Sequence, residues 1–173
     1  MSLTKKLLTA AAQSGVIMFA GDVTCQAFVN STTSFWKEVD AGRAAKMGLV
    51  GFSLHGPYMY LAFSRVDNYF GVASTLRNVL TKTAVIQLSA FPFYLCVLFA
   101  YLGFLEGRSF PTEIVSNVKE KAKKAYMAGC VFWPIANIFG FRYIPSHARV
   151  MYLASVGVVW NTYISYMNQD IAR

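Results

Sequence analysis

Trp133-Pro134-Ile135-Ala136-Asn137 decides the fold, together with two later segments, Phe141-Arg142-Tyr143-Ile144-Pro145 and Trp160-Asn161-Thr162-Tyr163-Ile164-Ser165. They set prolines and tryptophans into a C-terminal third that is otherwise nearly free of charge. Proline breaks the hydrogen-bond ladder of a helix, and the freed backbone groups are costly in hydrocarbon. Neighbouring helices of a packed membrane bundle can satisfy those groups. The pattern therefore predicts an all-α, polytopic transmembrane helix bundle with proline-kinked helices.

Composition and the spacing of charges support a membrane protein. Hydrophobic residues make up 55% of the 173 residues and charged residues only 14%, against about 25% in ordinary soluble domains. Aspartate, glutamate, lysine and arginine are absent over residues 48–64, 83–105, 125–141 and 150–169. A membrane helix needs about 20 mostly apolar residues. These runs predict spans near residues 45–65, 83–105, 125–142 and 149–168, within a single transmembrane domain covering residues 1–173.

A fifth apolar stretch, residues 7–28, is more polar than the others. It carries Gln13, Asp22 and Gln26, which can share one flank of a helix. Such a helix either spans the membrane with this flank against partners or lies in the membrane interface. The chain is therefore expected to have four to five spans. The positive-inside rule favours the arrangement in which this stretch does not span, because lysine and arginine then gather on the side of both termini.

The net charge of +8 comes from basic residues at the ends of apolar segments. The main group immediately precedes the apolar run that begins at residue 125, and consists of Lys119, Lys121, Lys123 and Lys124. Lysines in such places meet anionic headgroups. They predict binding to the lipid bilayer and to anionic phospholipids such as cardiolipin. No nucleic-acid motif accompanies them, so nucleic acid is not an expected partner.

Five polar side chains inside the apolar segments are candidates for lining a pore or joining helices: Gln13, Asp22, Gln26, Gln87 and Asn137. Asp22 is either a pore carboxylate or one half of an ion pair with Arg149 or Arg43. The ion pair is favoured because buried charges are usually paired. We expect Asp67, with Arg65, to end the second span near the headgroups. Arg142 and Arg149 flank Pro145 and are expected to snorkel to the interface.

No arrangement of residues predicts an enzyme, a metal site or a cofactor. The chain lacks GxSxG and HExxH motifs and has no phosphate-binding loop. Its three cysteines form no CxxC, and with only two histidines no metal site can be assembled from the sequence. The N-terminus is basic, rich in hydroxyls and free of acids until Asp22. That composition favours an organellar address over a secretory signal.

Two further segments, Gly56-Pro57-Tyr58-Met59-Tyr60 and Lys82-Thr83-Ala84-Val85-Ile86-Gln87, complete a pattern. From about Gly21 to Ser165 the chain resembles the Mpv-seventeen and peroxisomal-membrane-protein (Mpv–Sym–Pmp) family of small organellar membrane proteins. The resemblance is strongest in the C-terminal third. It implies a structural role for Gly56, Pro57, Asp67, Trp133, Pro134, Pro145, Arg149, Trp160 and Tyr163.

The resemblance implies residence in the mitochondrial inner membrane, with the peroxisomal membrane as the alternative. It also implies a small, non-selective channel that supports metabolite or ion balance. The chain departs from the family pattern where Tyr60 replaces a histidine and Ile86 replaces an aspartate. Lost intramembrane polar groups favour a second reading. In it, the chain is a structural accessory subunit of a respiratory complex or ATP synthase. Its partners are then the other subunits, or copies of itself if it forms a homo-oligomer.

Overall fold

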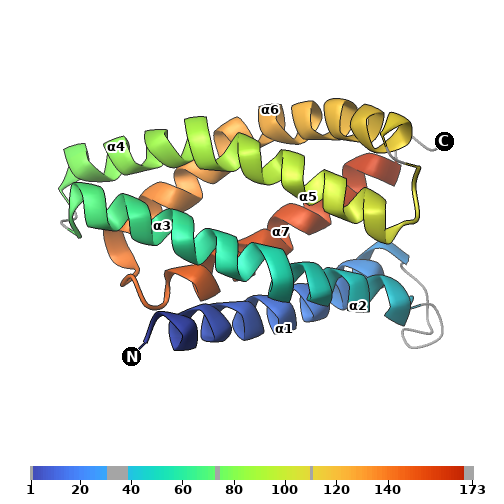
Figure 1. The fold of residues 1–173 in the computed structure, drawn as a ribbon, viewed down its shortest axis with the longest axis horizontal. Helices are drawn as coiled ribbons and strands as arrows, with labels where there is room; N and C mark the ends of the chain where they lie inside the picture. The colour runs from blue at the N-terminus through green and yellow to red at the C-terminus, as the bar shows by residue number, and fades with distance from the viewer. Residues whose placement is uncertain (1, 31–38, 73–74, 110, 170–173) are drawn as a thin grey trace. The chain divides into compact units, whose positions relative to one another are not determined.

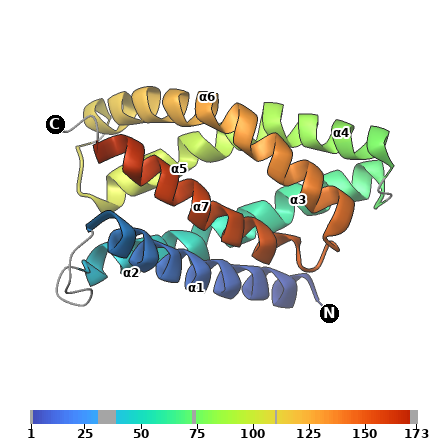
Figure 2. The same cartoon turned by 180° about the vertical axis from the view of Figure 1, so that it is seen from behind.

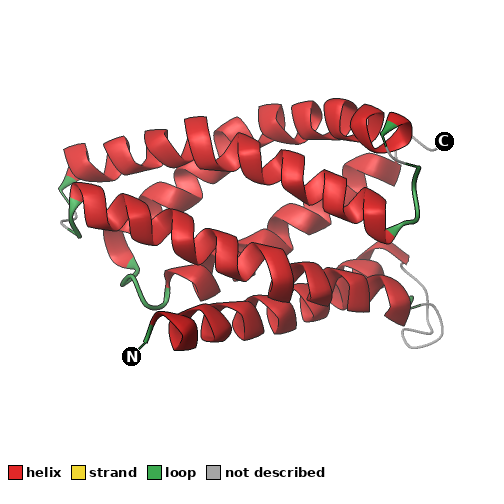
Figure 3. Ribbon diagram, in the orientation of Figure 1, coloured by secondary structure: helices red, strands yellow, loops and turns green. Residues whose placement is uncertain are grey.

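The computed structural model describes residues 2–30, 39–72, 75–109 and 111–169, and every regular element in these ranges is helical (Figures 1 and 3). The α-helices are α1 (Leu3–Asn30), α2 (Ala41–Val50), α3 (Gly56–Phe70), α4 (Leu76–Val85), α5 (Phe91–Leu105), α6 (Thr112–Tyr143) and α7 (Arg149–Gln169). Two π-helical turns, η2 (Gly51–His55) and η3 (Ile86–Ala90), directly precede α3 and α5. The all-α prediction is confirmed.

Two of the described helical stretches are long and apolar enough to cross a membrane, namely Leu3–Ala27 and Leu76–Leu105. The apolar helix Arg149–Trp160 is shorter. The first stretch covers the predicted segment 7–28 up to residue 27, and the second contains the predicted span 83–105. The total of four to five spans stays a prediction.

The chain forms two compact units. The first comprises Met1–Pro57 and Val150–Arg173, and the second comprises Tyr58–Arg149. The first unit thus holds α1, α2, η2 and nearly all of α7, and the second holds most of α3 and all of α4, η3, α5 and α6 (Figures 1 and 2). The single domain expected from the sequence also stays a prediction.

Within the first unit, α1 packs closely on α2 and η2 because small residues line the contact. A Cβ added at Gly51 would lie 2.5 Å from the carbonyl oxygen of Ser14, and one at Gly56 would meet the backbone of Ala10 and Ala11 even more closely. Small residues allow such close approach of helix backbones in membranes. Gly56, which the family resemblance marks as structural, is required for this packing.

Within the second unit, α6 packs against α5, α4 and η3. The ring centroids of Phe91 and Trp133 lie 5.8 Å apart, and those of Phe63 and Phe141 lie 5.2 Å apart. Trp133, one of the residues that the family resemblance marks as structural, is buried. These aromatic pairs join α3, α5 and α6 around the polar groups of this unit.

Each π-turn is followed closely by a proline. Pro57 comes two residues after η2, and Pro92 comes two residues after η3. The N–H groups of Gly56 and Phe91, just before the prolines, donate to carbonyls five residues back instead of four. A proline ring clashes with the carbonyl four residues earlier, and the wider π-turn gives that carbonyl room. Pro134 lies within α6.

Candidate functional site

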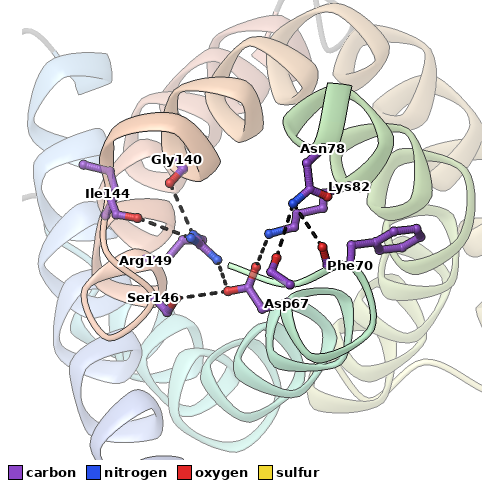
Figure 4. A network of polar contacts seen from close by, with 9 residues as sticks. Asp67, Phe70, Asn78, Lys82, Gly140, Ile144, Ser146 and Arg149 are labelled. Atoms are coloured by element: carbon purple, nitrogen blue, oxygen red, sulfur yellow. Dashed lines mark hydrogen bonds and ion pairs between the residues drawn. The ribbon is translucent and has the colours of Figure 1, made fainter. Parts of the chain in front are cut away.

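A buried ion cluster in the second unit joins α3, α4 and Arg149. Asp67 near the end of α3 accepts a hydrogen bond of 2.8 Å from Lys82 Nζ on α4 and one of 2.5 Å from Arg149 Nη1 at the start of α7 (Figure 4). Asp67, Lys82 and Arg149 are 7%, 2% and 4% exposed. Both carboxylate oxygens of Asp67 therefore bind a cation away from solvent.

The structure adds a partner to two of the charges expected near the headgroups: Asp67 and Arg149 are buried against each other, so Arg149 does not extend away from the protein as a snorkelling side chain would. Arg142 is exposed. The depth of these residues in the membrane stays a prediction. Asp67 lies beyond the predicted span 45–65. Burial by itself would raise the pKa of its carboxyl, but the hydrogen bonds and charges of Lys82 and Arg149 lower that pKa below its usual value.

Arg149 also ends α6. Its Nε donates to the Gly140 carbonyl and its Nη2 to the Ile144 carbonyl, each at 3.3 Å. The last carbonyls of a helix lack partners within the helix, and a guanidinium can satisfy them. Ser146, just after Pro145 in the turn between α6 and α7, donates to Asp67 Oδ2 at 3.1 Å. The turn is thus attached to the cluster at both ends.

The connection between α3 and α4 positions Asp67 and Lys82 relative to each other. The Nδ2 of Asn78 on α4 donates to the carbonyl of Phe70 at 3.1 Å and to that of Gly71 at 3.4 Å (Figure 4). Gly71 has φ +78, a value that a glycine adopts without strain. This turn brings Asp67 opposite Lys82.

An aromatic ring completes the cluster. The ring centroid of Phe141 lies 5.2 Å from Lys82 Nζ and 4.7 Å from Arg149 Cζ. A cation over an aromatic face gains about 0.5–2 kcal/mol. Phe141 therefore stabilises both cations, by less than a second carboxylate would.

Three buried polar atoms of the second unit have no hydrogen-bond partner among the described residues: Thr83 Oγ1, Gln87 Oε1 and Asn137 Oδ1. Thr83 and Gln87 follow Lys82 on α4 and η3, and Asn137 lies one turn before Phe141 on α6. Because Lys82 meets Phe141 and Gln87 Nε2 lies 3.7 Å from Cys130 Sγ, the two helices run antiparallel here. The unpaired atoms therefore lie along the contact between these two points.

A second polar cluster lies in the first unit. Asp22 Oδ1 accepts from Arg43 Nε at 3.1 Å, and Asp22 Oδ2 accepts from Gln26 Nε2 at 2.7 Å. Gln26 also bonds both the N–H and the carbonyl of Asp40, the N-cap residue of α2. Of the two arginines expected to pair with Asp22, the structure selects Arg43. Asp22 and Gln26 join α1 to the start of α2.

The five candidate pore residues consequently separate. Asp22 and Gln26 bond to each other, and Gln13 is half-buried elsewhere on α1. Gln87 and Asn137 belong to the second unit.

Lys82 was missed by the sequence reading, because it directly precedes a charge-free run and looks like a flanking residue. The signal that could have found it is an opposite charge, Asp67, across a short turn.

The lysine group on α6 is mostly exposed: Lys119, Lys123 and Lys124 are exposed and Lys121 is half-buried. Lys124 Nζ lies 2.8 Å from Glu120 Oε1, and this hydrogen bond lowers the pKa of the Glu120 carboxyl.

Trp160 is buried in α7. The side chain of Tyr163 lies outside the described residues. No group of three or more histidine, cysteine or acidic residues gathers in the described ranges.

Comparison with known proteins agrees with the resemblance. The model of the Mpv17 / PMP22 family matches residues 103–165. PXMP2/4 family protein 4 of Dictyostelium discoideum is 30% identical over 134 residues, which cover 78% of this chain and 71% of that protein. The mitochondrial inner membrane protein Mpv17 of Drosophila melanogaster is 30% identical over 86% of this chain and 88% of its own length. Protein SYM1 of Saccharomyces cerevisiae is 27% identical over 94% of this chain and 84% of its own. No solved structure matches.

Proposed function

This chain belongs to the Mpv17/PMP22 family, and we propose from that membership that it is an integral protein of the mitochondrial inner membrane that forms a small, non-selective channel. The name of the Drosophila relative supports this location. The PXMP2/4 names of other relatives keep the peroxisomal membrane as the alternative. The proposal gives the chain no catalytic role.

One observation carries the channel: the unpaired side-chain oxygens of Thr83, Gln87 and Asn137 along the contact of α4 and η3 with α6. A buried polar atom without a partner costs about 1–3 kcal/mol, and buried water is the usual remedy. Three such atoms along one helix contact support a hydrated path for small solutes. Asp22 and Gln26 have no place in it, because they already bond to each other.

Solute flux from liposomes that contain the purified chain tests this proposal. Asn137→Leu should lower the flux severalfold, because it replaces a polar atom of the path with an apolar group of similar size. The fold should survive, since removing an unpaired buried polar atom is close to neutral. Asn68→Leu, at an exposed position on α3, is the control and should conduct like wild type. Equal flux from the two variants, or none from wild type, would reject the channel.

The alternative is a structural accessory subunit of a respiratory complex or ATP synthase. The cluster of Asp22, Gln26 and Arg43 supports it, because there the intramembrane polar groups hold helices together. Native-gel electrophoresis of gently solubilised organelle membranes separates the two proposals. Co-migration with a large complex at fixed stoichiometry would support the subunit. Migration alone or as a small homo-oligomer would support the channel.

We also propose anionic phospholipids such as cardiolipin as partners of the lysine group on α6. Its exposed ammonium groups directly precede the apolar part of that helix. Lipid analysis of the purified, detergent-solubilised chain tests this partnership: replacing Lys119, Lys123 and Lys124 by glutamine should lower the amount of anionic lipid that stays bound and leave neutral lipid unaffected.

A further inference from the structure

The charge of the ion cluster in the second unit is not balanced. Two cations, Lys82 and Arg149, share one carboxylate, Asp67, so the side chains carry two minus one, or +1. The other described acids of this unit bind elsewhere. Glu106 pairs with Arg108, Glu120 pairs with Lys124, and Glu113 accepts from the backbone N–H of Ser109.

A buried excess charge is expensive. Buried charges are found with counter-ions because an unpaired ion in apolar surroundings loses its hydration. The contact with Phe141 stabilises each cation by less than a carboxylate would. One more negative charge beside Lys82 and Arg149 would therefore stabilise the cluster among the described residues.

The cluster also has more hydrogen-bond donors than acceptors. Lys82 Nζ carries three N–H groups and donates one of them, to Asp67. Arg149 carries five and uses three, to Asp67, Gly140 and Ile144. The hydroxyl of the neighbouring Thr83 has no partner. Several donors around one positive charge suit an oxyanion better than a single-atom ion.

The cluster lies next to an exposed segment of the chain. Ser146, which donates to Asp67, is itself exposed, as are its neighbours Pro145 and His147. Ser146 thus connects the buried cluster to an exposed turn of the chain.

We propose that Lys82 and Arg149, held by Asp67, form a binding site for a phosphate group, supplied by free phosphate or by a phospholipid headgroup. Both sources present the same oxyanion. The site is separate from the lysine group on α6 and does not require the chain to conduct. Asp67 positions the two cations and limits their excess charge to +1.

Thermal unfolding of the full chain in an uncharged detergent tests the proposal. Inorganic phosphate is the probe, with sodium gluconate keeping ionic strength constant. Three proteins change the cluster charge in steps: Asp67→Asn carries +2, wild type +1 and Lys82→Met zero. The Tm of wild type should rise with the logarithm of phosphate concentration. The rise should be larger for Asp67→Asn and absent for Lys82→Met.

Arg77→Met is the matched control, because it removes one exposed positive charge from the same helix. It should respond to phosphate like wild type. An equal response of Lys82→Met and wild type, or a lost response in Arg77→Met, would overturn the site. If Asp67→Asn does not fold, the comparison of wild type with Lys82→Met still decides.

A second series replaces phosphate by cardiolipin in mixed micelles and distinguishes the sources. A Lys82-dependent rise in Tm with free phosphate alone assigns the site to a soluble anion. A Lys82-dependent rise with the lipid alone assigns it to a headgroup. No rise with either probe in wild type would overturn the proposal.

Discussion

The two buried carboxylates show what single residues reveal before the structure is known. A buried charge needs a partner, so the sequence could predict that Asp22 pairs with an arginine, and Arg43 was one of the two named. It could not predict that Arg149 pairs with Asp67, because that choice depends on how α3 packs against the end of α6 and the turn that follows it. Lys82 could not be assigned to the cluster either. A lysine beside an apolar run is expected to contact headgroups, and only the packing of α4 on α3 shows that it pairs with Asp67.

The three charges of the ion cluster contribute unequally to stability. Asp67→Asn leaves two buried cations without a counter-charge, and it should cost about 3–5 kcal/mol of unfolding free energy, the usual cost of removing one partner of a buried pair. Lys82→Met leaves a neutral pair of Asp67 and Arg149, so its cost should be much smaller. Denaturant titration in detergent without phosphate measures both. A larger loss for Lys82→Met than for Asp67→Asn would contradict the assigned charges.

At the scale of elements, the charge-free runs located the helices well. Each predicted segment lies within a helical run of the structure, although the runs extend further where charged residues continue the helix, as Lys119–Lys124 do in α6. The prolines predicted local distortion. They did not predict π-turns, because a proline alone does not say whether the helix bends or changes its hydrogen-bond spacing.

The close packing of α1 on η2 gives a prediction at this scale. Gly51→Ala places a Cβ against the backbone of Ser14 and Gly15, where neither side can yield easily. It should lower the unfolding free energy by about 1–3 kcal/mol, the range for overpacked sites.

Gly157→Ala on α7 is the matched control for this change. No atom lies within 4 Å of the added Cβ, and alanine is the better helix former by about 1 kcal/mol. Its Tm should therefore stay the same or rise. Equal losses in the two variants would show that the contact of α1 with η2 does not require glycine.

At the scale of the whole molecule, the sequence predicted one polar set, and the structure divides it between two units. Asp22 and Gln26 bond to each other in the first unit, whereas the side-chain oxygens of Asn137 and Gln87 stay unpaired in the second. Polarity within an apolar segment can be read from sequence. Whether a polar group is already hydrogen-bonded depends on its neighbours in space. Polar groups that are bonded to other helices join those helices, whereas unpaired polar groups can line a path.

The proposed channel requires that water reaches the unpaired side-chain oxygens between α4, η3 and α6. Cysteine accessibility measures this most directly, in a variant in which Cys25, Cys96 and Cys130 are replaced. Asn137→Cys in reconstituted membranes should react with a membrane-impermeant, charged thiol reagent. Leu88→Cys, at a position 73% exposed on the outer face of η3, should stay unmodified in lipid. Modification of Asn137→Cys alone is the predicted result, and an inert Asn137→Cys would contradict the hydrated path.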